Sequence, residues 1–553
     1  MAQYKCDLDD IYFNLFQFLK VYEGTEFEES DLREVIVQFE NFVKNEIYPT
    51  RQESDALGVK LTGEGVVVPE ILHKAKKAYY ENGWYGLGVA EELGGMPVPA
   101  PVAFACDSLY VGSNVGFSMY SDLTRGAMNV ILKVGDQKQK DKIVPKMMDG
   151  TWGGTMCLTE SGAGSDVGAV KTSAKPLGEN LYSISGVKIF ISSGESDLFE
   201  NNIHLVLAKT PGAPEGTKGL SLFLVPRYNY DDGKSNNVFC TKIEEKMGIH
   251  ASSTCELTFG QNGECVGELI GKEFEGMQNM FIMMNEARLL CGTQGESQAN
   301  LAYELTKQYC SERSQFGVTI EKHPDVAKTL LKMRALGRGM RALILYTSKF
   351  FDLKDEERVA LLTPVCKSYC SEMGFHLSVD AVQCHGGYGF CSEYGIEQFV
   401  RDTKIATIYE GTNAIQANDF LLRKILGDEG KTLMGFFNEM KTDLAAFQES
   451  FPQETLEVTN SLKDFEKIMQ KVTVWAKEKN YNQLMYVATD LLRFNANLFT
   501  AWLLGKQAML AQSKMKTDES KKEYYESKLV DFNTFCKFYL IENRAISSTL
   551  LNF

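Results

Sequence analysis

The sequence predicts an α+β protein in which an antiparallel sheet domain lies between two helical domains and a further helical domain follows. Before residue 151 and after residue 268, apolar residues recur every three or four positions, which is the period of amphipathic helices. Between these positions the chain contains short alternating and β-branched runs separated by glycine and proline, which is typical of strands. The length of 553 residues also exceeds what one hydrophobic core usually holds.

The composition is that of a globular chain and limits the classes of function. Hydrophobic residues make up 44% and charged residues 24% of the sequence, and the net charge of −15 disfavours general binding to nucleic acids or anionic membranes. The thirteen cysteines form no CxxC pair, which argues against a zinc site and for a reducing compartment. No signal peptide or membrane-spanning run is recognisable, so we predict a cytoplasmic protein without membrane insertion.

The first helical domain is predicted over residues 1–150. Runs such as LREVIVQFENFVKNEI and EILHKAKKAYYENGWYGLG have the helical period. Glycines and prolines at residues 88–101 interrupt this pattern, because neither residue type favours a helix interior. A second helical stretch is then predicted over residues 102–148.

The sheet domain is predicted over residues 151–268, where strand-like runs such as YSISGVKIFISS, IHLVLAK and GLSLFLVPR follow at short spacing. The helical period returns near Phe274, which predicts a helical bundle over residues 269–430. Runs such as SLKDFEKIMQKVTVWAKEK predict further amphipathic helices in an extension over residues 431–553.

The segment RDTKIATIYEGTNAIQ, residues 401–416, contains a candidate general base. Glu410 lies between Tyr409 and Gly411, an apolar and tightly turned setting in which a carboxylate loses water and its pKa rises toward neutrality. An alternative is that Glu410 caps a helix, since Gly-Thr-Asn follows it. By its local sequence alone, the capping role is favoured.

A glycine-rich loop follows the first predicted strand. In MCLTESGAGSDVGAVKTSA, residues 156–174, Gly162 and Gly164 allow close approach to a planar ring or a phosphate, while Thr159, Ser161 and Ser165 supply donors. These features suit a flavin, although an ordinary β-turn with capping serines has the same composition.

Two aligned side chains on a predicted strand form another candidate contact. Phe190 and Ser192 are two residues apart in KIFISSGES, so both should face the same side of a sheet. An aromatic and a hydroxyl on one face could cover and hydrogen-bond a flavin ring. The alternative is a core phenylalanine followed by a turn serine.

Two later motifs suit a phosphate-containing cofactor. Arg313 and Phe316 in CSERSQFG are three residues apart, which places them on one helical face, and the arginine fork matches a pyrophosphate while the aromatic matches an adenine. The alternative is a solvated arginine beside a core phenylalanine. In AVQCHGGYGF, Gly386 and Gly387 let backbone amides approach a phosphate, and Gln383 offers an amide partner.

Together these motifs resemble those of the acyl-CoA dehydrogenase family, whose fold has the same helix, sheet, helix order. The similarity is strongest at IYEGTNAIQ, because the family's glutamate at this place removes the α-proton of an acyl thioester. The resemblance implies noncovalently bound FAD. It assigns cofactor contacts to Met156, Leu158, Thr159, Ser165, Phe190, Ser192, Arg313, Phe316, Gln383, Gly386, Gly387 and Thr412.

The chain departs from the family pattern at a few of these positions. Ser161 replaces a proline found in many members, and Phe190 and Ser192 replace tryptophan and threonine, which keeps an apolar cover but removes an indole donor. His385 replaces a more usual apolar residue or glycine and receives no role. The family uses Arg313 and Gln383 to hold the FAD of a neighbouring subunit, which implies a homodimer or larger assembly.

The resemblance also selects between two positions for the base. Some long-chain members carry it on an earlier helix, directly before an arginine that matches Arg288, but this chain has Ala287 there. Glu286 is one residue away and so is turned by about 100° around the helix axis. The base is therefore expected to be Glu410. The implied substrate contacts are Ser165, Asn285, Arg288, Tyr409 and Gly411.

The function implied by the resemblance is the α,β-dehydrogenation of an acyl-CoA to a trans-2-enoyl-CoA. Glu410 would remove the α-proton and flavin N5 would take the β-hydride, while the backbone N–H of Glu410 and a ribityl hydroxyl polarise the thioester oxygen. An electron-transfer flavoprotein would accept the electrons.

The extension over residues 431–553 is similar to that of a larger subgroup that includes 3-methylmercaptopropionyl-CoA dehydrogenase. A methionine-rich helix around Met283 suggests medium to long acyl chains, since methionine adapts to varied apolar shapes. The alternative functions are those of a 3-methylmercaptopropionyl-CoA dehydrogenase, an acyl-CoA oxidase, or a DNA-associated flavoprotein of the alkylation-response type.

Overall fold

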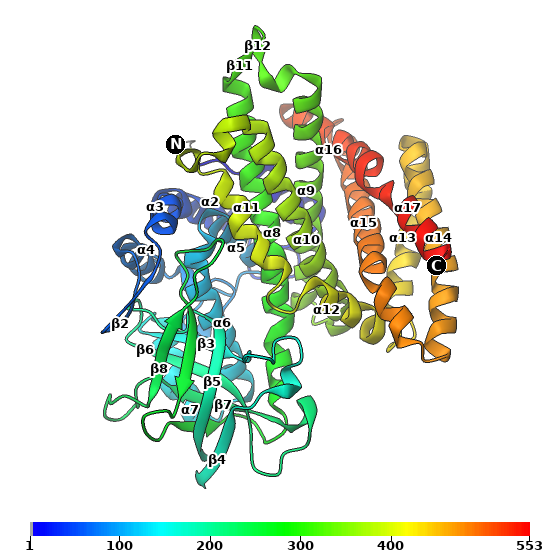
Figure 1. The fold of residues 1–553 in the computed structure, drawn as a ribbon. Coiled ribbons are helices and arrows are strands. Elements are labelled where there is room, and N and C mark those ends of the chain that lie inside the picture. Colours follow the sequence, from blue (N-terminus) through cyan, green and yellow to red (C-terminus); the bar gives the residue numbers. More distant parts are fainter. Residues whose placement is uncertain (1–3, 553) are drawn as a thin grey trace. The chain divides into compact units, whose positions relative to one another are not determined.

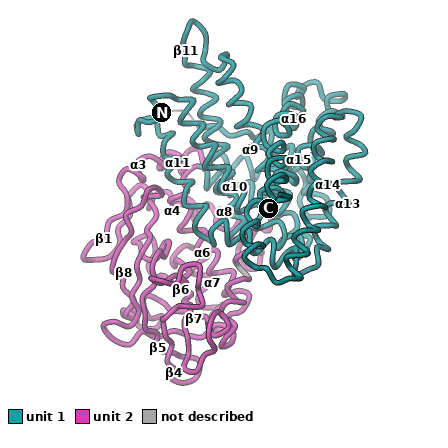
Figure 2. The backbone as a smooth tube through the Cα atoms, turned by 45° about the vertical axis from the view of Figure 1, so that its right-hand side comes forward, with its two compact units in different colours: residues 1–40, 99–112, 288–553 teal, residues 41–98, 113–287 magenta. Residues whose placement is uncertain are grey.

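The computed structural model describes residues 4–552, and the side chains of residues 282 and 283 lie outside that description. The chain forms two compact units (Figure 2). Unit 1 contains Met1–Glu40, Pro99–Gly112 and Arg288–Phe553, and unit 2 contains Asn41–Val98 and Ser113–Ala287. Unit 2 thus holds the sheet with much of the first helical region, and unit 1 holds the later helices.

Unit 2 is built around a sheet that, among the described residues, has eight strands in the order β10-β7-β6-β4-β5-β9-β8 with β3 beside β6 (Figure 1). Its central strands β6 and β7 are almost entirely buried, as their continuous apolar sequences suggest. The strands are β3 (Trp152–Cys157), β4 (Ser173–Gly178), β5 (Leu181–Ser192), β6 (Asn201–Lys209), β7 (Leu220–Pro226), β8 (Val238–Ile243), β9 (Thr254–Phe259) and β10 (Val266–Leu269).

The predicted sheet domain is present, and two of its strand pairs are parallel, those of β3 and of β4 with β6. Most neighbouring strands are antiparallel, as expected, but β3 pairs with β6 in parallel from Trp152 opposite Asn201 to Cys157 opposite Val206. Alternating apolar residues indicate which face of a strand is buried and carry no information on its direction. The predicted antiparallel arrangement is therefore confirmed for most strand pairs, and the pairs with parallel direction could not be recognised from the pattern.

Two helices of unit 2, α6 and α7, begin at capping residues. The single helical stretch predicted over residues 102–148 is instead α5 (Ala100–Ser113), which lies mainly in unit 1, followed by α6 (Val115–Val134) and α7 (Gln137–Met148). The Asn114 side chain accepts a hydrogen bond from the N–H of Phe117 and starts α6, and Asp136 and Gln139 form a reciprocal capping box that starts α7. The other elements are α3 (Thr50–Leu57), α4 (Glu70–Glu81) and an unpredicted hairpin of β1 (Lys60–Thr62) and β2 (Gly65–Val67).

Unit 1 is helical, apart from a small hairpin described below. Its helices are α1 (Leu8–Tyr12), most of α2 (Glu29–Phe42), α8 (Gly276–Glu312) from Arg288 onward, α9 (Pro324–Asp352), α10 (Glu356–His385), α11 (Glu397–Lys404), α12 (Asn413–Asn418), α13 (Lys431–Ser450), α14 (Pro452–Lys477), α15 (Tyr481–Lys514), α16 (Lys522–Phe535) and α17 (Glu542–Asn552). No helix of the described chain is both long and apolar enough to cross a membrane.

A buried network of charged side chains ties the N-terminal helix α1 to the core of unit 1. Asp10 on α1 is fully buried and lies 2.7 Å from Lys528 of α16 and 3.1 Å from Arg341 of α9. Arg341 in turn lies 3.1 Å from Glu296 of α8. Because each buried charge contacts an opposite charge, the cost of removing it from water is offset.

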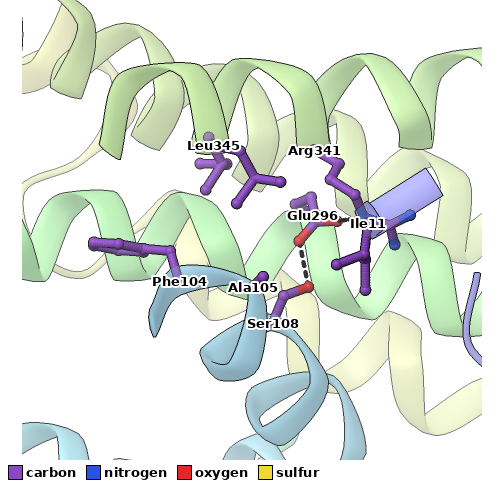
Figure 3. Close-up of a pocket in the computed structure, with 8 residues that line it drawn as sticks. Ile11, Phe104, Ala105, Ser108, Glu296, Arg341 and Leu345 are labelled. Carbon is purple, nitrogen blue, oxygen red and sulfur yellow. Dashed lines mark hydrogen bonds and ion pairs between the residues drawn. The ribbon is translucent and has the colours of Figure 1, made fainter. Parts of the chain in front are cut away.

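A small cavity of about 10 Å³ lies beside this network (Figure 3). Ser108 donates a hydrogen bond to Glu296 at 2.7 Å on one side, and apolar side chains such as Phe104 and Leu345 complete the wall. This volume holds one water molecule at most, so the cavity is too small for a substrate or a cofactor.

The network predicts that Asp10→Asn lowers the free energy of unfolding by about 3–5 kcal/mol, because Lys528 and Arg341 lose a buried anion. Although burial by itself opposes ionisation, Lys528, Arg338 and Arg341 hold the pKa of Asp10 well below its usual range. The stabilisation is therefore complete at neutral pH and is lost as the pH falls below the ordinary carboxyl range. Urea unfolding measured between pH 7 and pH 3 should show the difference between the wild type and the variant decreasing.

The matched control is Lys441→Gln, which removes one member of an exposed pair with Glu466 at 3.0 Å and should not change the urea midpoint measurably. An Asp10→Asn variant as stable as the wild type at pH 7 would contradict the role assigned to the network.

Candidate active site

Glu410 lies in a tight turn between the short helix η10 (Ile405–Thr407) and α12, and two consecutive residues of this turn have left-handed backbone angles. The φ angle is +55° at Glu410 and +83° at Gly411. The side-chain amide of Gln416 donates to the carbonyl oxygens of Glu410 at 2.9 Å and Gly411 at 3.3 Å, which stabilises the turn. The φ of +83° at position 411 favours glycine, and a Cβ there would also approach this amide to 2.8 Å.

The carboxyl group of Glu410 is set up to accept a proton. The side chain is half-buried, and burial raises its pKa above the usual value, opposed by the cations Arg288 and Lys367. Neither its carboxylate nor its backbone N–H forms a hydrogen bond within the part of the chain that the structure describes. The capping alternative is wrong, because Thr412 caps α12 by accepting a hydrogen bond from the N–H of Ile415 at 3.3 Å.

The other expected substrate contacts of unit 1 lie on or beside the same turn. Arg288 on α8 is buried and forms an ion pair with Asp419 at 3.0 Å, so its charge is compensated within the protein. The Tyr409 hydroxyl donates a hydrogen bond to the Gln294 side chain. Both contacts join α8 to the segment that carries the candidate base.

Glu286, the other acid considered for the base, is engaged elsewhere. It lies in unit 2 next to the half-buried Asn285, and its carboxylate accepts a hydrogen bond from Asn129 of α6 at 2.7 Å. Burial raises its pKa as well, and Arg125 and Asn129 oppose the increase. A raised pKa therefore does not distinguish the two acids, whereas hydrogen bonding does.

The glycine-rich loop of unit 2 is anchored by a buried ion pair that the sequence analysis missed. Lys188 on β5 lies 2.8 Å from Glu160 and donates to the carbonyl of Leu158 at 3.0 Å. Glu160 also accepts hydrogen bonds from the backbone N–H groups of Lys171 and Thr172 at 2.6 and 3.0 Å. In the sequence, the lysine within the otherwise apolar strand GVKIFIS was the feature that could have indicated a buried ion pair.

This anchor positions the expected flavin contacts of the loop. Met156 belongs to β3, and Leu158 and Thr159 follow it directly. Thr159 accepts a backbone hydrogen bond from Ile189 at 2.9 Å, which joins the loop to β5, while Ser165 is exposed beyond the turn at Gly162, whose φ is +88°.

Phe190 and Ser192 do not follow the simple alternation on which their common face was predicted. The pairing of β5 with β9 shifts register between Lys188 and Ile191, and Phe190 has a φ of +58°. Such a bulge re-aims the side chains of a strand. Phe190 is 60% exposed, so it does not belong to the core of unit 2.

The predicted shared helical face of Arg313 and Phe316 is also wrong. Helix α8 ends at Glu312, and the chain continues into a hairpin of β11 (Ser314–Gln315) and β12 (Val318–Thr319), which projects beyond the ends of α8 and α9 in Figure 1. Phe316 occupies the turn with a φ of +52° and is 96% exposed. A glycine at position 317, with a φ of +82°, allows this turn.

An open cavity of about 430 Å³ brings four predicted cofactor contacts together: Arg313, Gln383, Gly386 and Gly387. The guanidinium of Arg313 lies 5.5 Å from the centre of the Tyr388 ring. Gly386 has a φ of +61°, and a Cβ at either glycine would meet no atom within 4 Å, so this wall of the cavity is free of side chains.

These features fit a dinucleotide such as FAD. An arginine fork and bare glycine backbone suit a pyrophosphate, and the exposed ring of Phe316, three residues after Arg313, provides an apolar surface that does not pack in the core of unit 1. Backbone strain at Phe190, Phe316 and Glu410 is itself typical of functional positions. Fold and site thus define a flavin-dependent oxidoreductase.

Comparison with known families agrees with this class. The N-terminal, middle and C-terminal domains of acyl-CoA dehydrogenase match residues 29–151, 155–261 and 275–424, and the acetyl-CoA dehydrogenase C-terminal-like domain matches residues 436–552. The chain therefore belongs to the acyl-CoA dehydrogenase family, whose members are FAD-dependent oxidoreductases. The last match identifies the extension predicted over residues 431–553 as a known additional domain.

Individual relatives cover nearly the whole chain. It is 34% identical to 3-methylmercaptopropionyl-CoA dehydrogenase of Ruegeria pomeroyi, over 95% of this chain and 93% of the relative. It is also 34% identical to the broad-specificity linear acyl-CoA dehydrogenase of Mycobacterium tuberculosis, over 100% and 98% of the two chains. The acyl-CoA dehydrogenase of Bacillus anthracis complexed with FAD shares the fold, with a TM-score of 0.76 at 23% identity over 96% of this chain and 90% of that chain.

The exposure of Phe316 leads to a prediction on cofactor binding. Phe316→Ala should raise the dissociation constant for FAD about tenfold or more, because an aromatic ring stacked on a base usually contributes that much affinity. The apoprotein should unfold at the same temperature as the wild type, because the ring is 96% exposed and makes little packing contact. FAD titration by fluorescence quenching and thermal unfolding of the apoprotein measure the two effects.

Tyr481→Ala is the matched control, since Tyr481 is an exposed aromatic in the extension and has no expected contact with FAD. Equal FAD affinity of Phe316→Ala and the wild type would remove Phe316 from the site.

Proposed function

We propose that the protein dehydrogenates an acyl-CoA thioester between the α- and β-carbons, giving a trans-2-enoyl-CoA, with Glu410 as the general base. The observation that carries this proposal is the half-buried Glu410 carboxylate, which has a raised pKa and no hydrogen-bond partner in the described chain. A carboxylate with a raised pKa is a stronger base than an ordinary one and so is better suited to take a weakly acidic carbon-bound proton.

The turn at Glu410 also provides a donor for the developing negative charge. Loss of the α-proton places charge on the thioester oxygen, and a preorganised N–H group stabilises this charge without rearrangement. The backbone N–H of Glu410 is uncommitted within the described chain and so is available for the thioester oxygen. FAD, when bound, supplies the two-electron acceptor for the hydride.

The residues proposed to hold the cofactor fall into groups with separate tasks. Arg313, Gln383, Gly386 and Gly387 line one cavity and suit the pyrophosphate part. The flavin ring is suited by two groups in unit 2: the anchored loop with Met156, Leu158, Thr159 and Ser165, and the strand residues Phe190 and Ser192. The two remaining proposed cofactor contacts are Phe316 and Thr412. The proposed substrate contacts are Asn285, Arg288, Tyr409, Gly411 and Ser165.

We further propose medium to long linear acyl chains, supported by the 34% identity to the broad-specificity linear acyl-CoA dehydrogenase. The side chain of Met283, on which a wide pocket was predicted, lies outside the described residues. The equally similar 3-methylmercaptopropionyl-CoA dehydrogenase supports a short thioether substrate as the second candidate.

Anaerobic bleaching of the bound flavin separates the two substrates. With butyryl-, octanoyl-, palmitoyl- and 3-methylmercaptopropionyl-CoA at equal concentration, we expect the fastest bleaching with octanoyl- or palmitoyl-CoA, because longer chains bury more apolar surface. Rapid bleaching by the thioether substrate alone would establish the second candidate instead.

Three properties of the working enzyme complete the proposal. A homodimer or larger assembly is supported by the family's use of Arg313 and Gln383 on a neighbouring subunit's FAD, and an electron-transfer flavoprotein is the proposed electron acceptor. A cytoplasmic location is supported by thirteen free cysteines.

The role of Glu410 predicts that Glu410→Gln lowers the rate of flavin bleaching by octanoyl-CoA by about 10²–10⁴-fold or more, because an amide cannot accept the α-proton at neutral pH. The amide is nearly isosteric, so the turn held by Gln416 and the FAD content should be unchanged. Anaerobic stopped-flow measurement of flavin absorbance at pH 7.5 gives the rate, and the absorption spectrum gives the FAD content.

Glu286→Gln is the matched control and should retain most of the activity, since Asn129 already holds the Glu286 carboxylate. An inactive Glu286→Gln together with an active Glu410→Gln would reverse the assignment of the base.

A further inference from the structure

A buried lysine lies beside the candidate base. Lys367 is on α10 and its side chain is completely shielded from solvent. Its ammonium group donates one hydrogen bond, to the side-chain oxygen of Asn413 at 3.0 Å, and forms no ion pair with any carboxylate of the described chain. A buried charge of this kind is costly unless a nearby anion compensates it.

Asn413 connects this lysine to the turn of Glu410. It is the first residue of α12, three positions after Glu410. Its side-chain amide donates to the carbonyl of Ser368 at 3.2 Å, and its side-chain oxygen also accepts a hydrogen bond from Ser371 at 3.3 Å. Helix α10 therefore fixes the start of α12, three residues after the base.

The charged groups around Lys367 leave Glu410 as its counter-ion. The guanidinium of Arg288 is paired with Asp419 at 3.0 Å, so that carboxylate is already used. Cys291 on α8 also faces Lys367, but burial raises the pKa of its thiol to about 12, which keeps it neutral. Burial lowers the pKa of Lys367, and Cys291 and Glu410 oppose this decrease. Glu410 is thus the remaining acid that can compensate the ammonium charge.

We propose that Lys367 is a positioning residue for the reaction: its buried ammonium is the counter-ion of the Glu410 carboxylate, and its hydrogen bond to Asn413 fixes the turn that carries Glu410. This role rests on the proposed function of Glu410 as the base. The ammonium is electrostatically coupled to the carboxylate, so its effect is greatest before the proton is taken and disappears once Glu410 becomes neutral. Lys367 therefore sets the pH range in which the base is active.

The test is the pH dependence of anaerobic flavin bleaching by saturating octanoyl-CoA in Lys367→Met. The substitution keeps an apolar stem of similar length but removes the charge, so the acid limb of the rate profile should move up by about one pH unit or more. Lys367→Arg restores a cation and should return the limb toward the wild-type position. A purely structural role would lower the rate at all pH values without moving the limb.

Lys404→Met is the matched control, because it removes a partly exposed cation from α11 and should leave the acid limb in place. If Lys367→Met does not fold, Lys367→Gln gives the same test, because its amide removes the charge yet can still donate a hydrogen bond toward Asn413, and the limb should again move up. An unmoved limb in a folded Lys367→Met, or in Lys367→Gln where Lys367→Met fails to fold, would overturn the proposal.

The outcome is separable from that of the proposed function. If Glu410→Gln loses bleaching while the acid limb of Lys367→Met is unmoved, the base stands and the role of Lys367 is wrong. If Glu410→Gln bleaches at the wild-type rate, the proposed base fails irrespective of Lys367.

Discussion

The candidate active site depends on two consecutive left-handed residues, Glu410 and Gly411. A non-glycine residue in this conformation costs about 1–2 kcal/mol, so the surrounding structure must compensate it. Gln416 does so from one side by binding both carbonyl oxygens, and Asn413 anchors the next turn to α10 from the other. This conformation directs the backbone N–H and the side chain of one residue away from the helix ladder, which leaves both available for chemistry.

Much of the fold was predictable because hydrophobic periodicity differs between helices and strands. The order of helices, sheet and helices, and the helical extension, followed from this alone. The details that failed depend on backbone direction and local irregularity: the parallel pairing of β3, the bulge near Phe190 and the hairpin that places Phe316 beyond the end of α8. A three-residue spacing indicates a helical face only while the helix continues.

The site was predictable to a different extent. Glycine-rich motifs and the IYEGT segment are local in sequence, so their residues could be named, and their roles rest on family membership. The supporting residues could not, because Gln416, Lys367 and the Glu160–Lys188 pair act through contacts that the chain makes on folding. The one sequence feature that could have indicated such residues is a lysine within an apolar strand or helix, and both Lys188 and Lys367 have this feature.

The ion network around Asp10 has a consequence for how the chain is made. Lys528 emerges from the ribosome more than five hundred residues after its partner Asp10, and all of unit 2 is synthesised between them. Unit 1 therefore cannot complete its core during synthesis. Helix α1 must wait for α16 with its carboxylates still hydrated, while unit 2 already has all of its own sequence, so one of the earliest segments of unit 1 should be among the last to dock.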